Sequence, residues 1–140
     1  MTRALGLDLG SVRIGVATSD PGRVIASPYD VISRGVDHAA DHAVIAAAVA
    51  DTEAAVVVIG LPKALSGKET AAAQLVRVEA EELRGALSVP VVFWDERLST
   101  VTAQRSLIEG GMRRKERKGT VDKVAAAVIL QSWLDAGCPV

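Results

Sequence analysis

The sequence predicts an α/β fold in which a mixed five-stranded sheet carries helices on both faces. Three extended segments precede the first helix, and the turns between them are short enough for antiparallel hairpins. Strands and helices then alternate, which predicts a parallel portion of the same sheet. The run 54–59 is apolar at every position, as expected of a central strand with both faces covered.

The elements follow from the spacing of apolar residues and from turn residues. Alanines at helical spacing mark the first helix, and Gly110-Gly111 is expected to end the third. Strands are predicted within 5–11, 12–18, 24–32, 54–59 and 89–94, and helices over 36–51, 69–87, 100–109 and 121–135. A loop carrying Lys63, Ser66, Gly67 and Lys68 joins the fourth strand to the second helix.

The length, composition and charge of the chain limit the classes of protein to which it can belong. Residues 1–140 are expected to form one domain, because 140 residues are too few for two ordinary domains. No apolar run reaches the length of a membrane span and no signal peptide precedes the first strand, so we expect a cytoplasmic protein with no membrane partner. The single cysteine, Cys138, excludes an internal disulfide and a cysteine-based zinc site. The net charge of −1 argues against non-specific coating of nucleic acid.

Three carboxylates occupy positions where an acid is unfavourable for folding. Asp8 interrupts the first strand, where alternation leaves only Gly6 and Gly10 beside it on its face. Glu96 follows the last strand, and Asp122 shares a helical stripe with the apolar residues Ala125, Ala126, Ile129 and Trp133. A carboxylate on that stripe points at the sheet, where it could meet the ends of the first and last strands.

A structural role competes with each of these assignments. Asp8 could stabilise a turn, and Asp122 could favour the start of a helix whose N-cap is Thr120. Glu96 could form a surface ion pair with Arg97 or Arg13. Neighbouring residues on a strand face opposite ways, so the sequence leaves open whether Asp95 or Glu96 points inward.

If the three acids converge, their mutual repulsion requires a cation. Carboxylate oxygens suit Mg²⁺ or Mn²⁺ rather than softer metals. Two such ions about 4 Å apart can support the hydrolysis of a phosphodiester. The acids therefore predict a metal site that acts on nucleic acid.

Basic residues gather before Asp122 and are candidates for contacts with the phosphate backbone. Aromatic residues make up only 3% of the chain, which argues against an extended base-stacking surface, and Trp94 and Trp133 are expected in the core. His38 and His42 are spaced four apart but lack a zinc-protease motif, so we expect a solvated helix face there. The predicted nucleic-acid contacts are Arg113, Arg114, Lys115, Arg117 and Lys118, with Arg13, Lys63, Lys68 and Arg97 from other segments.

Four motifs in order resemble the YqgF/RuvX family over nearly the whole chain. They are Leu5-Gly6-Leu7-Asp8-Leu9-Gly10-Ser11-Val12-Arg13-Ile14-Gly15-Val16-Ala17, Gly60-Leu61-Pro62, Asp95-Glu96-Arg97-Leu98-Ser99-Thr100 and Val121-Asp122-Lys123-Val124-Ala125-Ala126-Ala127-Val128-Ile129-Leu130-Gln131. The resemblance implies an RNase H-like fold related to the RuvC resolvases. It also implies an acidic triad at Asp8, Glu96 and Asp122, with Glu96 preferred over Asp95. The segment Lys63-Ala64-Leu65-Ser66 departs from the family, in which an Asn-containing segment is usual.

Members of that family are described as Holliday junction resolvases and as nucleases that mature the 5′ end of pre-16S rRNA. The first expectation is therefore a metal-dependent nuclease acting on an RNA precursor, and the alternative is a resolvase acting on branched DNA. A non-catalytic factor that binds a ribosomal precursor is a third hypothesis. An ATP-binding protein of the actin and sugar-kinase type is disfavoured because those proteins need two such domains. A homodimer would favour junction resolution, and a monomer would favour the RNA role.

Overall fold

A five-stranded mixed sheet forms the centre of the molecule. The computed structural model describes residues 2–64, 66–98 and 114–139, and for residues 98 and 114–123 it describes the backbone only. The strand order is β3-β2-β1-β4-β5, with β1–β2 and β2–β3 antiparallel and β1–β4 and β4–β5 parallel. The predicted fold class and strand directions are therefore confirmed. The bounds are β1 (Arg3–Leu9), β2 (Arg13–Ser19), β3 (Ala26–Ser33), β4 (Ala54–Leu61) and β5 (Val91–Asp95).

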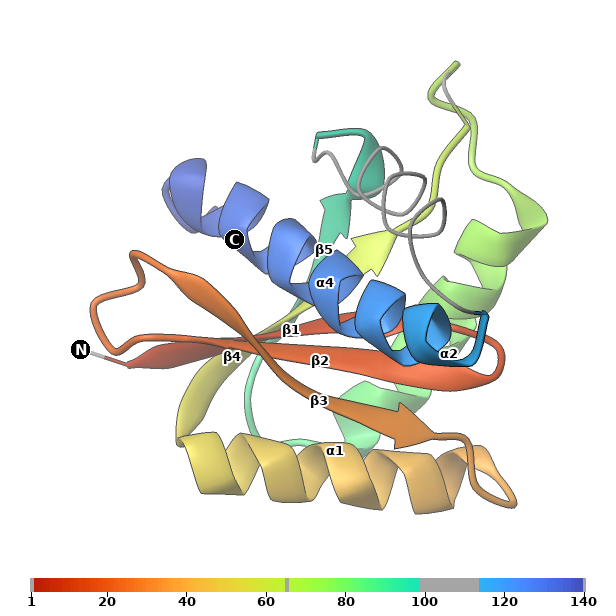
Figure 1. Ribbon diagram of the computed structural model, residues 1–140, viewed down its shortest axis with the longest axis horizontal. Coiled ribbons are helices and arrows are strands. Elements are labelled where there is room, and N and C mark those ends of the chain that lie inside the picture. The colour runs from red at the N-terminus through yellow and green to blue at the C-terminus, as the bar shows by residue number, and fades with distance from the viewer. Residues whose placement is uncertain (1, 65, 99–113, 140) are drawn as a thin grey trace.

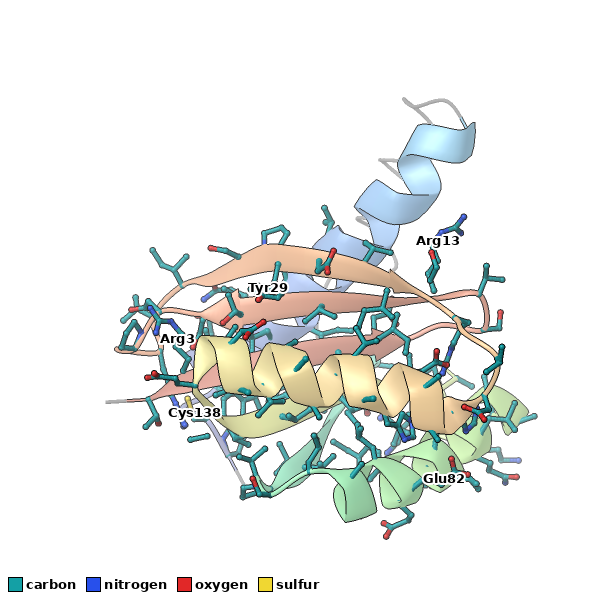
Figure 2. The ribbon with its side chains drawn as sticks, turned by 90° about the horizontal axis from the view of Figure 1, so that it is seen from below. Arg3, Arg13, Tyr29, Glu82 and Cys138 are labelled. Atoms are coloured by element: carbon teal, nitrogen blue, oxygen red, sulfur yellow. The ribbon has the colours of Figure 1, made fainter. Side chains whose placement is uncertain are left out.

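Helices cover both faces of this sheet. Helix α4 lies across one face, and α1 and α2 lie on the other (Figures 1 and 2). Among the described residues, no helix combines the length and apolar character needed to cross a membrane. The predicted helix 100–109 falls outside the described residues. The bounds are α1 (His38–Thr52), α2 (Ala71–Ala86), the short 3-10 helix η1 (Glu96–Leu98) and α4 (Arg114–Asp135).

Helices α1 and α2, which lie on the same face of the sheet, each begin with an N-cap side chain. The Asp37 carboxylate accepts a hydrogen bond from the amide of Ala40 at the start of α1. The Thr70 hydroxyl accepts one from the amide of Ala73 and donates to the carbonyl of Pro62, which ties α2 to the end of β4. These bonds satisfy amides that the first turn of a helix leaves without an intrahelical partner.

Alternation along the strands divides the apolar side chains into two cores. Leu5 and Leu7 face α1 and α2, whereas Ala4 faces α4. Trp133 is buried in the α4 core, and Trp94 packs against that core and donates its indole N–H to the Ser132 hydroxyl at 2.9 Å. Both tryptophans therefore belong to the core, as predicted.

The last helix begins earlier than the sequence suggested. Gly119 and Thr120 led us to expect a start near residue 121, but α4 already begins at Arg114. Arginine, lysine and glutamate favour a helix, and an internal glycine costs only about 1 kcal/mol. Thr120 is therefore an internal residue of α4 and not its N-cap, which removes the capping explanation for Asp122.

Gly6 allows α4 to lie close to β1. A Cβ atom at this position would lie 2.8 Å from the Cβ of Leu130 and 3.1 Å from the carbonyl oxygen of Ala126. Both neighbours belong to α4, so a side chain at residue 6 would push the helix away from the sheet.

We expect Gly6→Ala to lower the free energy of unfolding by about 1–3 kcal/mol through this overpacking. Gly85→Ala is the matched control, because a Cβ atom at Gly85 would meet nothing within 4 Å. The control should leave stability unchanged or raise it by up to about 1 kcal/mol, since alanine favours helices over glycine. Urea unfolding followed by circular dichroism measures both, and equal stability of the two variants would contradict the expectation.

Candidate active site

Asp8 lies near the end of β1 and is only 7% exposed. It lines a cavity of about 620 Å³ at the edge of the sheet where the parallel strands β1, β4 and β5 end. Glu96 and Gly60 line the same cavity. The structure therefore brings together two of the three predicted acids. Asp8 lies in β1 and Glu96 follows β5, and these are the two outer strands of the parallel set β1-β4-β5.

Gly60 allows Glu96 and helix α4 to lie close to β4. It follows Ile59, the residue of β4 that pairs with Leu7 of β1. A Cβ atom at Gly60 would lie 3.2 Å from Oε1 of Glu96 and 2.5 Å from Cδ1 of Ile129. The absence of a side chain at residue 60 therefore lets both Ile129 of α4 and Glu96 approach β4 closely.

Asp95 has a different environment from its neighbour Glu96. Oδ2 of Asp95 lies 2.6 Å from Nη2 of Arg97 and 4.0 Å from Nζ of Lys63. The hydrogen bonds from Arg97 hold the pKa of Asp95 below its usual value. A Cβ atom at Gly67 would lie 3.3 Å from Nη1 of Arg97, so Arg97 also contacts the loop before α2. Asp95 thus anchors the segments beside the cavity, while Glu96 lines it.

Asp122 is a residue of α4, for which only the backbone is described at this position. Ala125, Ala126, Ile129 and Trp133, which define its predicted stripe, are buried against the sheet. The helix therefore presents that stripe to the sheet as predicted. The participation of Asp122 in the site stays a prediction.

The predicted nucleic-acid contacts divide into three groups. Arg13 lies where β1 turns into β2, at the opposite end of the sheet from Arg3 and Cys138 (Figure 2). Lys63, Lys68 and Arg97 belong to segments beside the cavity, and Lys63 and Arg97 approach Asp95. Arg113 is outside the described residues, and the backbone of Arg114, Lys115, Arg117 and Lys118 forms the first turns of α4.

A buried ionic cluster forms another part of the cavity wall and was missed in the sequence. Arg34 lies between Asp41 of α1 and Glu79 of α2, and these two carboxylates are 3% and 4% exposed. Nε2 of His42 lies 2.9 Å from Oε2 of Glu79. The expectation of a solvated face was therefore wrong for His42, which is buried because it lies on the same stripe of α1 as Ile45 and Val49.

The cluster holds its acids in the ionised form. Burial alone would raise the pKa of Glu79, but hydrogen bonds from Arg34 and His42 outweigh it and lower that pKa below its usual value. Burial opposes ionisation of Asp41 as well, and hydrogen bonds from the Gly35 amide and Arg34 lower its pKa. The Glu79 carboxylate in turn raises the pKa of Arg34.

Two groups of side chains could be considered for a metal. His38, His42 and Glu79 have ligand atoms within 4.8 Å of one another, but Nη1 of Arg34 lies 2.6 Å from Oε2 of Glu79, so a cation already occupies that carboxylate. Asp8 and Glu96 instead line one cavity together with Gly60. Oxygen donors of this kind fit Mg²⁺ or Mn²⁺.

A mixed sheet in this order, with helices on both faces and acids at the ends of its parallel strands, is the RNase H-like fold. A RuvC from Thermus thermophilus, solved in complex with a Holliday junction substrate, superposes with a TM-score of 0.56 at 16% identity over 99% of this chain and 98% of its own. A second structure of Thermus thermophilus RuvC gives a TM-score of 0.53 at 17% identity, over 97% of both chains.

Sequence comparison identifies the family within this class. The model of the RuvX family, described as Holliday junction resolvase, matches residues 2–136, and the chain belongs to this family. A protein of Mycobacterium sp. (strain KMS), named "Putative pre-16S rRNA nuclease", is 48% identical over 136 residues, which are 95% of this chain and 79% of that protein. A protein of the same name from Rhodococcus opacus (strain B4) is 44% identical over 137 residues, 95% and 77% of the two chains.

The ionic cluster predicts how stability depends on pH. Asp41 and Glu79 have lower pKa values in the folded protein than their ordinary 3.8 and 4.5, so the folded state binds fewer protons than the unfolded state. Their stabilisation is fully present above the ordinary values and is lost as the pH falls through the folded values. We expect Glu79→Gln to be less stable than the native protein at pH 7, with a difference that shrinks below pH 4.5.

Urea unfolding at intervals from pH 7 to pH 2.5 measures this difference. Asp51→Asn is the matched control, because Asp51 is an exposed acid on α1. A difference between the native protein and Glu79→Gln that stays constant over this range would contradict the expectation.

Proposed function

We propose that residues 1–140 form a single cytoplasmic, metal-dependent nuclease domain that cleaves phosphodiester bonds during 5′-end maturation of pre-16S rRNA. The observation that carries the proposal is that Asp8 and Glu96 line one cavity at the ends of parallel strands. Membership of the RuvX family supports nuclease chemistry, and the names of the bacterial relatives support the RNA substrate.

Asp8, Glu96 and Asp122 are the residues proposed to hold Mg²⁺ or Mn²⁺. Such an ion, when bound, supplies Lewis-acid stabilisation of the negative charge that develops on the phosphate during hydrolysis. The protein contributes a buried carboxylate at Asp8 of β1 and a second carboxylate at Glu96, which begins η1 directly after β5. Rigid placement of this kind keeps ligand geometry constant between turnovers.

The cavity also suits a substrate that is polar at one end and apolar at the other. Its volume of about 620 Å³ lies within the range usual for small-molecule and nucleotide sites. Away from the acids its wall includes the exposed side chains of Val36, Leu75 and Val78. We propose that the phosphate lies toward Asp8 and Glu96 and that the adjoining nucleoside contacts this apolar wall.

Substitution of the acids tests the catalytic proposal. Asp8→Asn and Glu96→Gln remove a negative charge with little change in shape. Each should lower the cleavage rate by at least about 100-fold, because loss of a group that only orients a metal ligand already costs about 10- to 100-fold. Asp51→Asn on the exposed surface of α1 is the control and should cleave like the native protein.

The assay uses labelled precursor-like single-stranded RNA and a four-way DNA junction, each with Mn²⁺, Mg²⁺ or a chelator. Cleavage of the RNA supports the proposed role, and paired cleavage of the junction by a homodimer would support the resolvase function for which the family is described. RNA binding without cleavage, unchanged in Asp8→Asn, would instead identify a non-catalytic ribosomal-precursor factor.

The basic start of α4 is proposed to bind the phosphate backbone. Charge reversal at Arg114 and Lys115 should weaken RNA binding by about 10-fold or more at 100 mM salt and reduce the salt dependence of log K by about 0.7 for each lost phosphate contact. Arg3→Glu is the control because Arg3 lies at the far end of the sheet (Figure 2). Fluorescence anisotropy with labelled RNA measures affinity, and equal salt slopes for all variants would exclude this surface.

A further inference from the structure

Arg34 directs every N–H group of its guanidinium to a partner. Nε and Nη2 donate to the carbonyl oxygen of Gly10 at 3.0 and 2.9 Å. Nη2 also donates to Oε1 of Glu79 at 2.8 Å, and Nη1 donates to Oε2 of Glu79 at 2.6 Å and to Oδ2 of Asp41 at 3.1 Å. These five bonds equal the five donors that a guanidinium has. Lysine has three donors and no planar fork, so it cannot reproduce them.

The two carboxylates that hold Arg34 are themselves fixed on separate helices. Oδ1 of Asp41 accepts the amide of Gly35 at 2.7 Å, so both oxygens of Asp41 are engaged. Oε2 of Glu79 also contacts His42 at 2.9 Å. Because Asp41 belongs to α1 and Glu79 to α2, the guanidinium is held from two directions by buried, ionised groups. A guanidinium group held in this way has little freedom to move.

The segment that Arg34 holds is the turn immediately after Asp8. The Gly10 carbonyl receives two of the guanidinium bonds, and the Gly10 amide donates to the carbonyl oxygen of Asp8 at 3.0 Å. The backbone amide of Arg34 also donates to the carbonyl oxygen of Val12 at 3.0 Å. Ser11 and Val12 expose their side chains, so packing of this turn contributes little to its order.

We propose that Arg34 is a positioning residue for the candidate active site: it fixes the β1–β2 turn against α1 and α2 and thereby the end of β1 that carries Asp8. This inference rests on the proposed nuclease function for its catalytic consequence. Its structural part, that Arg34 orders residues 10–12, stands independently of any activity. Arg34 and Asp8 both line the cavity, so a shift of the turn would change the shape of the site directly.

Arg34→Lys tests the structural part, in protein without added metal or substrate. We expect hydrogen exchange of the Gly10 amide, which donates to the Asp8 carbonyl oxygen, to accelerate by about 10-fold or more when followed by NMR. Arg84→Lys is a matched control, because Arg84 also contacts a carboxylate, that of Glu81, and donates to a backbone carbonyl, that of Val91, at 3.0 Å. Neither Arg84 nor its partners line the cavity. Unchanged exchange of the Gly10 amide in Arg34→Lys would overturn the proposal.

Kinetics test the catalytic part at a temperature well below the unfolding midpoint of each variant. We expect kcat for RNA cleavage by Arg34→Lys to fall about 10- to 100-fold, the range found for groups that orient metal ligands, while KM changes little. A purely structural role would lower the midpoint and leave kcat unchanged, as expected for Arg84→Lys. Accelerated exchange with native kcat would therefore overturn the positioning role.

A second variant covers the case in which Arg34→Lys does not fold. Glu79→Gln keeps an oxygen acceptor but loses the charge that orients the guanidinium, and it should accelerate exchange at Gly10 and lower kcat by a smaller factor than Arg34→Lys. Native values of both quantities in Glu79→Gln would overturn the inference. Absence of cleavage by the native protein would overturn the proposed function, and the exchange experiment would still decide whether Arg34 orders the turn.

Discussion

The close approach of α4 to the sheet is the constraint on which the arrangement of the candidate site depends. Gly6 of β1 and Gly60 of β4 have no side chains to separate the sheet from Leu130 and Ile129 of the helix. Asp8 lies two residues beyond Gly6 on the same strand face, and Glu96 lies beside Gly60. The two glycines thus allow α4 to lie close to the strands that carry the site, and Gly60 also allows Glu96 to approach β4.

Buried carboxylates serve two different purposes around the cavity. Asp41 and Glu79 are compensated by Arg34, so they stabilise the junction of α1, α2 and the β1–β2 turn. Asp8 and Glu96 border space that a ligand can enter. All four acids line the cavity, and Asp41 and Glu79 are distinguished by the guanidinium of Arg34, a fixed cation that compensates their charge. The difference in surroundings separates structural acids from candidate catalytic ones.

Much of the fold was readable from the sequence because alternation and apolar runs report burial directly. The five strands and their directions follow from short turns before residue 36 and helices after it. The same stripe argument that singled out Asp122 also applies to Glu79, which shares a face of α2 with Val76 and Leu83, and it would have identified the ionic cluster. Its partner Arg34 could not be predicted, because Arg34 lies just after β3 and its contacts with two helices depend on tertiary packing. The start of α4 was misplaced because glycine is tolerated inside a helix supported by the sheet.

The adjacent acids Asp95 and Glu96 show how a strand end can separate two functions. Successive residues leave a strand on opposite sides, so one acid can face the cavity only if the other faces away. Asp95 approaches Arg97 at 2.6 Å and Lys63 at 4.0 Å, so it holds both cations beside the cavity edge. The carboxylate that does not line the cavity therefore positions two cationic side chains next to the segment of the one that does.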